Sequence, residues 1–74
     1  MITESTVQEA LRVIVDNRKE KALNWAVNYA RVGILMTGVE LQTQCLYILG
    51  NITHWRGREA KAVRQTLKAF TGRV

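Results

Sequence analysis

Residues 58–70 read REAKAVRQTLKAF, and this stretch has the clearest secondary-structure pattern in the chain. At 100° per residue, its apolar side chains gather within about 80° of one another: Ala60, Val63, Leu67 and Phe70. Its basic side chains fall within about 120° on a separate face: Arg58, Lys61, Arg64 and Lys68. The spacing predicts an amphipathic helix with one apolar and one basic side, and Thr71-Gly72 is a typical helix stop.

The same helical period continues toward the N-terminus and predicts three further helices, at about 5–15, 20–35 and 38–55. The expected core positions are Val7, Leu11 and Ile14, then Leu23, Val27, Ala30 and Ile34, then Leu41, Cys45, Ile48, Leu49, Ile52 and Trp55. Capping-box patterns mark two of the starts: Ser5 with Gln8 or Thr6 with Glu9, and Thr37 with Glu40. We therefore expect an all-α fold, a compact bundle of four short helices (about 5–15, 20–35, 38–55 and 58–70) in a single domain, 1–74. The pattern leaves open whether Gly50 or Gly57 ends the third helix.

The small size of the chain favours self-association. A core built from 74 residues rarely gives more than about 3–5 kcal/mol of net stability. The single cysteine excludes an internal disulfide, and Cys45 with His54 leaves only two soft ligands where a zinc site needs about four. Without these supports, we expect regular helix packing and a homo-oligomer.

The helix expected at 20–35 has a second apolar stripe outside its core face. The stripe is spaced i, i+4, i+7 and i+11: Trp25, Tyr29, Val32 and Met36. Aromatic residues and methionine are enriched at protein interfaces, so this stripe is the predicted contact surface for another protein. Burial of the same stripe inside the bundle is the alternative.

The charge of the chain is concentrated at one end. The net charge is +5, and residues 1–53 contain five basic and five acidic side chains. The excess therefore lies in residues 54–74, where six cations face only Glu59. A basic end of this kind attracts polyanions such as nucleic acid, although it also serves as a simple solubility device.

Two further groups of residues are candidates for ligand binding. His54 and Arg56 stand at the corner before the last helix, whose N-terminus would add free backbone N–H groups for an anion. Tyr47, Asn51 and His54 fall on one polar stripe of the helix expected at 38–55. The predicted ligand-binding set is therefore Arg56, Arg58, Lys61, Arg64, Lys68, His54, Tyr47 and Asn51.

Catalytic chemistry has little support in the sequence. Cys45 and His54 are nine residues apart, which places them on opposite sides of one helix, and the acidic residues are scattered, with only Asp16 and Glu20 four residues apart at the break before residue 20. We expect no enzyme activity, no cofactor and no metal site. The N-terminus lacks the pattern of a signal peptide, and no apolar run approaches the ~20 residues of a membrane span. With a lone thiol, these features favour the cytoplasm and no membrane partner.

The second half of the chain resembles a group of known sequences. Residues 37–70, TGVELQTQCLYILGNITHWRGREAKAVRQTLKAF, are similar to small uncharacterised phage and prophage proteins of Gram-positive bacteria. The resemblance lies in Glu40-Leu41, Gln44, Cys45-Leu46-Tyr47, the corner from His54 to Gly57, and Ala60 to Phe70. It implies an accessory factor in the host cytoplasm that inhibits host defence or host enzymes, binds nucleic acid, or sequesters nucleotides.

Together these observations predict a non-enzymatic, phage-type accessory protein. Its expected ligand bears phosphate, either nucleic acid or a nucleotide, and binds the basic C-terminal helix to counteract host defence. The alternative is a protein–protein inhibitor of the anti-CRISPR kind, which docks onto a host protein through the aromatic stripe of the helix at 20–35.

Overall fold

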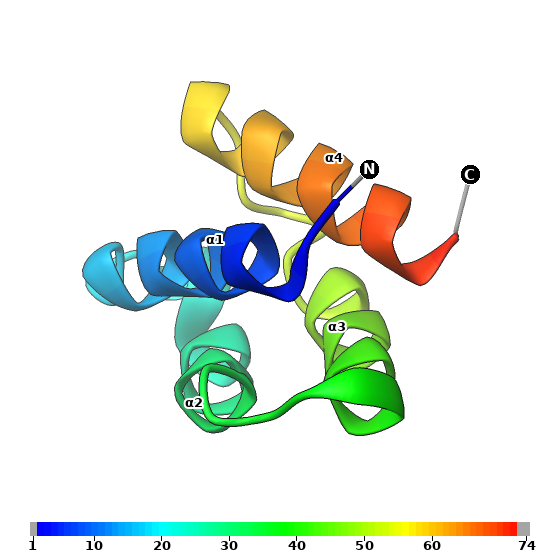
Figure 1. Ribbon diagram of the computed structural model, residues 1–74. Helices are drawn as coiled ribbons and strands as arrows, with labels where there is room; N and C mark the ends of the chain where they lie inside the picture. Colours follow the sequence, from blue (N-terminus) through cyan, green and yellow to red (C-terminus); the bar gives the residue numbers. More distant parts are fainter. Residues whose placement is uncertain (1, 73–74) are drawn as a thin grey trace.

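The computed structural model describes residues 2–72 and confirms the all-α bundle of four short helices. The chain runs through α1 (Glu4–Asp16), a single 3-10 turn η1 (Lys21–Leu23), α2 (Asn24–Gly33), α3 (Gly38–Gly50) and α4 (Arg58–Thr71). The helices pack in a ring, in which α1 contacts α2 and α4, and α3 closes the ring by contacting the same two helices. Figure 1 shows α4 at the top of the view and α1 below it, with α2 and α3 at the bottom. Arg73, one of the six cations of the basic end, lies outside the described residues.

The predicted caps of the first and third helices are wrong in detail. The N-cap of α1 is Thr3, two residues before Ser5, because the side-chain oxygen of Thr3 accepts a hydrogen bond from the backbone N–H of Thr6 at 3.2 Å. At α3, Thr37 is the N-cap residue, as predicted, but its side chain makes no cap hydrogen bond. The carboxylate of Glu4 accepts from the backbone N–H of Gly38 instead. The first turn of α1 therefore caps α3.

The second helix is shorter than the predicted 20–35. Its first turn is the separate η1, and the α-helix ends at Gly33. A Cβ atom at Gly33 would lie 2.8 Å from Leu11 Cδ1 and 3.3 Å from Gln44 Cγ. Glycine is therefore what lets the end of α2 approach α1 and α3 so closely.

The third helix ends at Gly50, so the prediction of a helix to residue 55 is wrong. Asn51 follows as the C-cap, and its side-chain amide donates to the carbonyl oxygen of Tyr47 at 2.7 Å. This local hydrogen bond competes with further helical pairing. The chain then turns between residues 51 and 57, yet Ile52 and Trp55 remain buried as predicted.

The core agrees with the helical spacing. The expected positions of α1 and α3, and those of the turn after α3, are all buried, and the largest fully buried side chains include Leu11, Leu41 and Leu67. Ile34 and Phe70 pack at its edge. No described helix combines the length and hydropathy that a membrane crossing requires.

Candidate functional site

The start of α4 is fixed by a glycine. Gly57 is the N-cap of this helix and has φ of +116°, a conformation that side-chain-bearing residues rarely adopt. At the other end, Gly72 closes the helix in the left-handed conformation. The two glycines set where the helix begins and ends.

The outer side of α4 carries three exposed cations, and we call these the basic face: Arg58, Lys61 and Lys68. The inner side of the helix buries Ala60, Val63 and Leu67, as predicted. Other exposed positions on this helix are Ala62, Gln65 and Ala69, which are small or polar, and Glu59, the one acidic residue beside the cations. An extended polyanion can therefore approach the basic face without meeting a bulky apolar side chain.

Arg64 does not belong to this face, which corrects the predicted stripe of four cations. Its guanidinium donates to the carbonyl oxygen of Trp55 at 2.7 Å and to that of Ile52 at 3.3 Å. Both bonds are partly buried, and both hold the turn between α3 and α4. Arg64 lies on the side of α4 that faces this turn, so its charge pairs with backbone carbonyls.

The residues before α4 do not form the predicted polar stripe. Because α3 ends at Gly50, Asn51 and His54 leave the helical register of Tyr47. The Asn51 amide is held by the Tyr47 carbonyl, and His54 is exposed in the turn. Arg56 is exposed as well, and its guanidinium donates to the carbonyl oxygen of Thr53 at 3.2 Å. Trp55 between them is a core residue, as expected.

Tyr47 belongs to a different surface. Its ring stacks on Tyr29 of α2, with centroids 6.1 Å apart and planes 24° apart. The side-chain amide of Gln44 donates to the carbonyl oxygen of Tyr29 at 2.8 Å and ties the two helices together beside this stack. The aromatic stripe predicted on α2 is thus continued on α3.

We call the set of exposed large hydrophobic side chains the apolar face: Trp25, Tyr29, Val32, Leu35, Val39, Leu46 and Tyr47. The predicted stripe contributes Trp25, Tyr29 and Val32 to it. Met36 is the exception, because α2 ends at Gly33 and the following turn brings Met36 against the core. The pattern missed the other four members, although the scarcity of charge in this part of the chain points to them.

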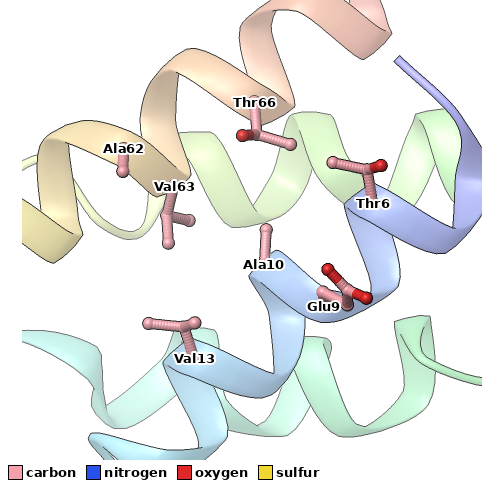
Figure 2. A pocket seen from close by; sticks show the side chains of 7 residues that line it. All are labelled: Thr6, Glu9, Ala10, Val13, Ala62, Val63 and Thr66. Carbon is pink, nitrogen blue, oxygen red and sulfur yellow. The ribbon is translucent and has the colours of Figure 1, made fainter.

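A shallow groove between α1 and α4 is a separate feature (Figure 2). Its volume is about 220 Å³, below the roughly 300–1,000 Å³ of typical small-molecule sites. It is lined by Thr6, Glu9, Ala10, Val13, Ala62, Val63 and Thr66. None of the predicted ligand-binding residues lines this groove.

Reactive side chains do not gather at any of these surfaces. Cys45 is fully buried, and burial raises the pKa of its thiol from 9.0 to about 11. The thiol therefore stays protonated at neutral pH and is a poor nucleophile. Within the part of the chain that the structure describes, no group of three histidine, cysteine or acidic side chains is placed to hold a metal ion.

Comparison of the chain with protein-family models, with curated proteins and with solved structures found no match.

Proposed function

We propose that this protein is a non-enzymatic, phage-type accessory protein of the host cytoplasm that binds nucleic acid through the basic face of α4. The proposal rests on the concentration of exposed positive charge on one helix of the fold. The excess of cations lies near one end of the chain, and Arg58, Lys61 and Lys68 present it to solvent from a single helix. The opposite side of that helix is occupied by the core.

The arrangement of these cations favours a polymeric ligand over a single nucleotide. Ten residues separate Arg58 from Lys68, which corresponds to about 15 Å along the helix axis at 1.5 Å per residue. A mononucleotide cannot reach both ends of such a row, whereas consecutive phosphates of a nucleic acid can. The groove between α1 and α4 is not lined by these cations, so contacts to phosphates dominate and we expect binding with little sequence preference.

A salt titration of binding tests the proposal. The probes are duplex DNA and single-stranded RNA, with a cyclic dinucleotide as the small ligand. The triple variant Arg58→Gln, Lys61→Gln, Lys68→Gln should weaken nucleic-acid binding and flatten the slope of log affinity against log salt. For duplex DNA, each lost phosphate contact should reduce the magnitude of that slope by about 0.9. Loss of all three contacts should therefore reduce it by up to about 2.7.

A matched control removes the same charge elsewhere. Arg12, Lys21 and Arg31 are exposed on α1, η1 and α2, so replacing all three with glutamine also lowers the net charge by three. This control should keep most of the affinity and most of the slope. Equal losses in both triple variants would show that only the overall charge matters, and would contradict a binding face on α4.

The second candidate function is inhibition of a host protein through the apolar face. It is favoured by the exposure of Trp25, Tyr29 and Val32, which the predicted stripe contains. In a cell-based assay of host defence, an inhibitor of this kind should keep its effect when the basic face is neutralised and lose it with Val32→Glu. The nucleic-acid function predicts loss of the effect in the neutralised variant.

A further inference from the structure

The apolar face is confined to one part of the bundle. Among residues 2–72, the exposed large hydrophobic side chains all lie between Trp25 and Tyr47, on α2, on α3 or in the turn that joins them. The same region is nearly free of charge, since residues 24–53 contain only Arg31 and Glu40. Such a concentration of exposed apolar surface in a small protein is typical of an interaction site.

The members of this face form neighbouring rows across the two helices. On α2, Trp25 and Val32 are seven residues apart and share one row. On α3, Val39 and Leu46 are also seven residues apart and form another row. The stacked rings of Tyr29 and Tyr47 join the two helices.

The exposed area of this face is a large part of what a stable dimer requires. Trp25 is 71% exposed, Val39 76% and Leu35 85%. Taking about 150–250 Å² for each aromatic side chain, the exposed parts of Trp25, Tyr29 and Tyr47 alone correspond to roughly 250–400 Å², and the four aliphatic members add to this area. Each partner in a standard interface contributes about 800 Å².

The charges favour a second copy of the same chain as the occupant. Each copy has a net charge of +5, and two basic faces of α4 would repel each other. The apolar face is the surface on which two copies meet without opposing cation rows, because Arg31 and Glu40 balance within its region. An uncharged patch is also complementary to itself, as a two-fold symmetric interface requires.

We propose that the apolar face binds the apolar face of a second copy, so that the protein is a symmetric homodimer built on α2 and α3. In this dimer the stacked tyrosines and Trp25 are covered. The basic face of α4 takes no part in the contact and stays open in both copies. The proposal stands on the apolar surface alone, so it does not depend on nucleic-acid binding.

Sedimentation of the protein over a concentration series tests the proposal. The parent chain should sediment as a dimer, and Trp25→Glu or Val39→Glu should shift it to the monomer while circular dichroism stays helical. Because the two variants alter different helices and both positions are highly exposed, neither should prevent folding. Each should raise the dissociation constant of the dimer by at least roughly 30-fold, as loss of a central interface residue does.

Gln65→Glu is the matched control, since it adds the same negative charge at an exposed position of α4. It should leave the dimer intact. A monomeric parent chain at submillimolar concentration would overturn the proposal and leave the apolar face to a different protein. Dimers that persist in Trp25→Glu and Val39→Glu, or that Gln65→Glu disrupts equally, would overturn it as well.

Discussion

Replacing Arg64 tests whether one cation of α4 has a structural role that its neighbours lack. In Arg64→Gln, the carbonyl oxygens of Ile52 and Trp55 lose a charged donor that now contacts them at 3.3 and 2.7 Å. A hydrogen bond to a charged group contributes about 1.5–3 kcal/mol to stability. Since one of these bonds is long and both are only partly buried, we expect a loss of about 2 kcal/mol in total.

Thermal unfolding measures this loss against a matched variant. One kcal/mol shifts the melting temperature of a domain of this size by about 4–8 °C, so Arg64→Gln should melt about 10 °C lower. Lys61→Gln removes the same charge from an exposed position of the same helix and should melt within a few degrees of the parent. The free energy of unfolding in urea gives an independent value for both variants.

Hydrogen exchange locates the effect. The backbone N–H of Trp55 donates to the carbonyl oxygen of Ile52 at 3.1 Å, within the turn that Arg64 holds. Its exchange should accelerate in Arg64→Gln and remain slow in Lys61→Gln. If the two variants melt together and Trp55 exchanges equally in both, Arg64 is an ordinary surface cation and the reasoning is refuted.

The helical core was predictable because burial repeats with the helical period. Leu41, Cys45 and Ile48 are buried at the positions that spacing alone assigns. Ile52 and Trp55 continue that spacing and are buried too, although the helix has already ended. A turn that buries every third residue has the same pattern as a helix, so periodicity could not locate the helix end.

The contacts that correct the prediction join residues far apart in the sequence. Glu4 caps Gly38 across 34 positions, and no local capping pattern contains this information. The bonds of Arg64 to the turn likewise depend on how α4 packs against α3. Helical spacing places Arg64 with the other cations of α4. It contains no information on the turn after α3 that packs beside Arg64 in the fold.

The apolar face was predictable in part for a related reason. Trp25 and Val32 stand apart from the core face of α2, so the spacing identifies them as a second stripe. On α3, the spacing leaves Val39 and Leu46 out of the predicted core, but it does not group them with the stripe on α2, because the period of one helix does not record how it packs against another. Their exposure becomes evident only once α3 is placed between α2 and α4 (Figure 1).

Two further substitutions test the long-range cap and the buried thiol. Glu4→Ala should lower the free energy of unfolding by about 1 kcal/mol, because it removes the acceptor for Gly38 N–H. Glu9→Ala, at an exposed position of α1, is the control and should change the free energy of unfolding little. Equal losses in the two variants would contradict the cap. Burial raises the pKa of the Cys45 thiol from 9.0 to about 11. Between these values the folded state keeps a proton that the unfolded chain releases. The contribution of Cys45 to stability is therefore complete below pH 9 and is lost as the pH rises toward 11. At pH 7 the free energy of unfolding of the parent chain should therefore exceed that of Cys45→Ala by about 1 kcal/mol, a small cavity effect. Between pH 9 and pH 11 the parent should lose roughly 2–3 kcal/mol relative to that variant, so that their order of stability reverses. Urea unfolding of both proteins across this range measures the difference, and a constant gap would show that Cys45 does not titrate as a buried group.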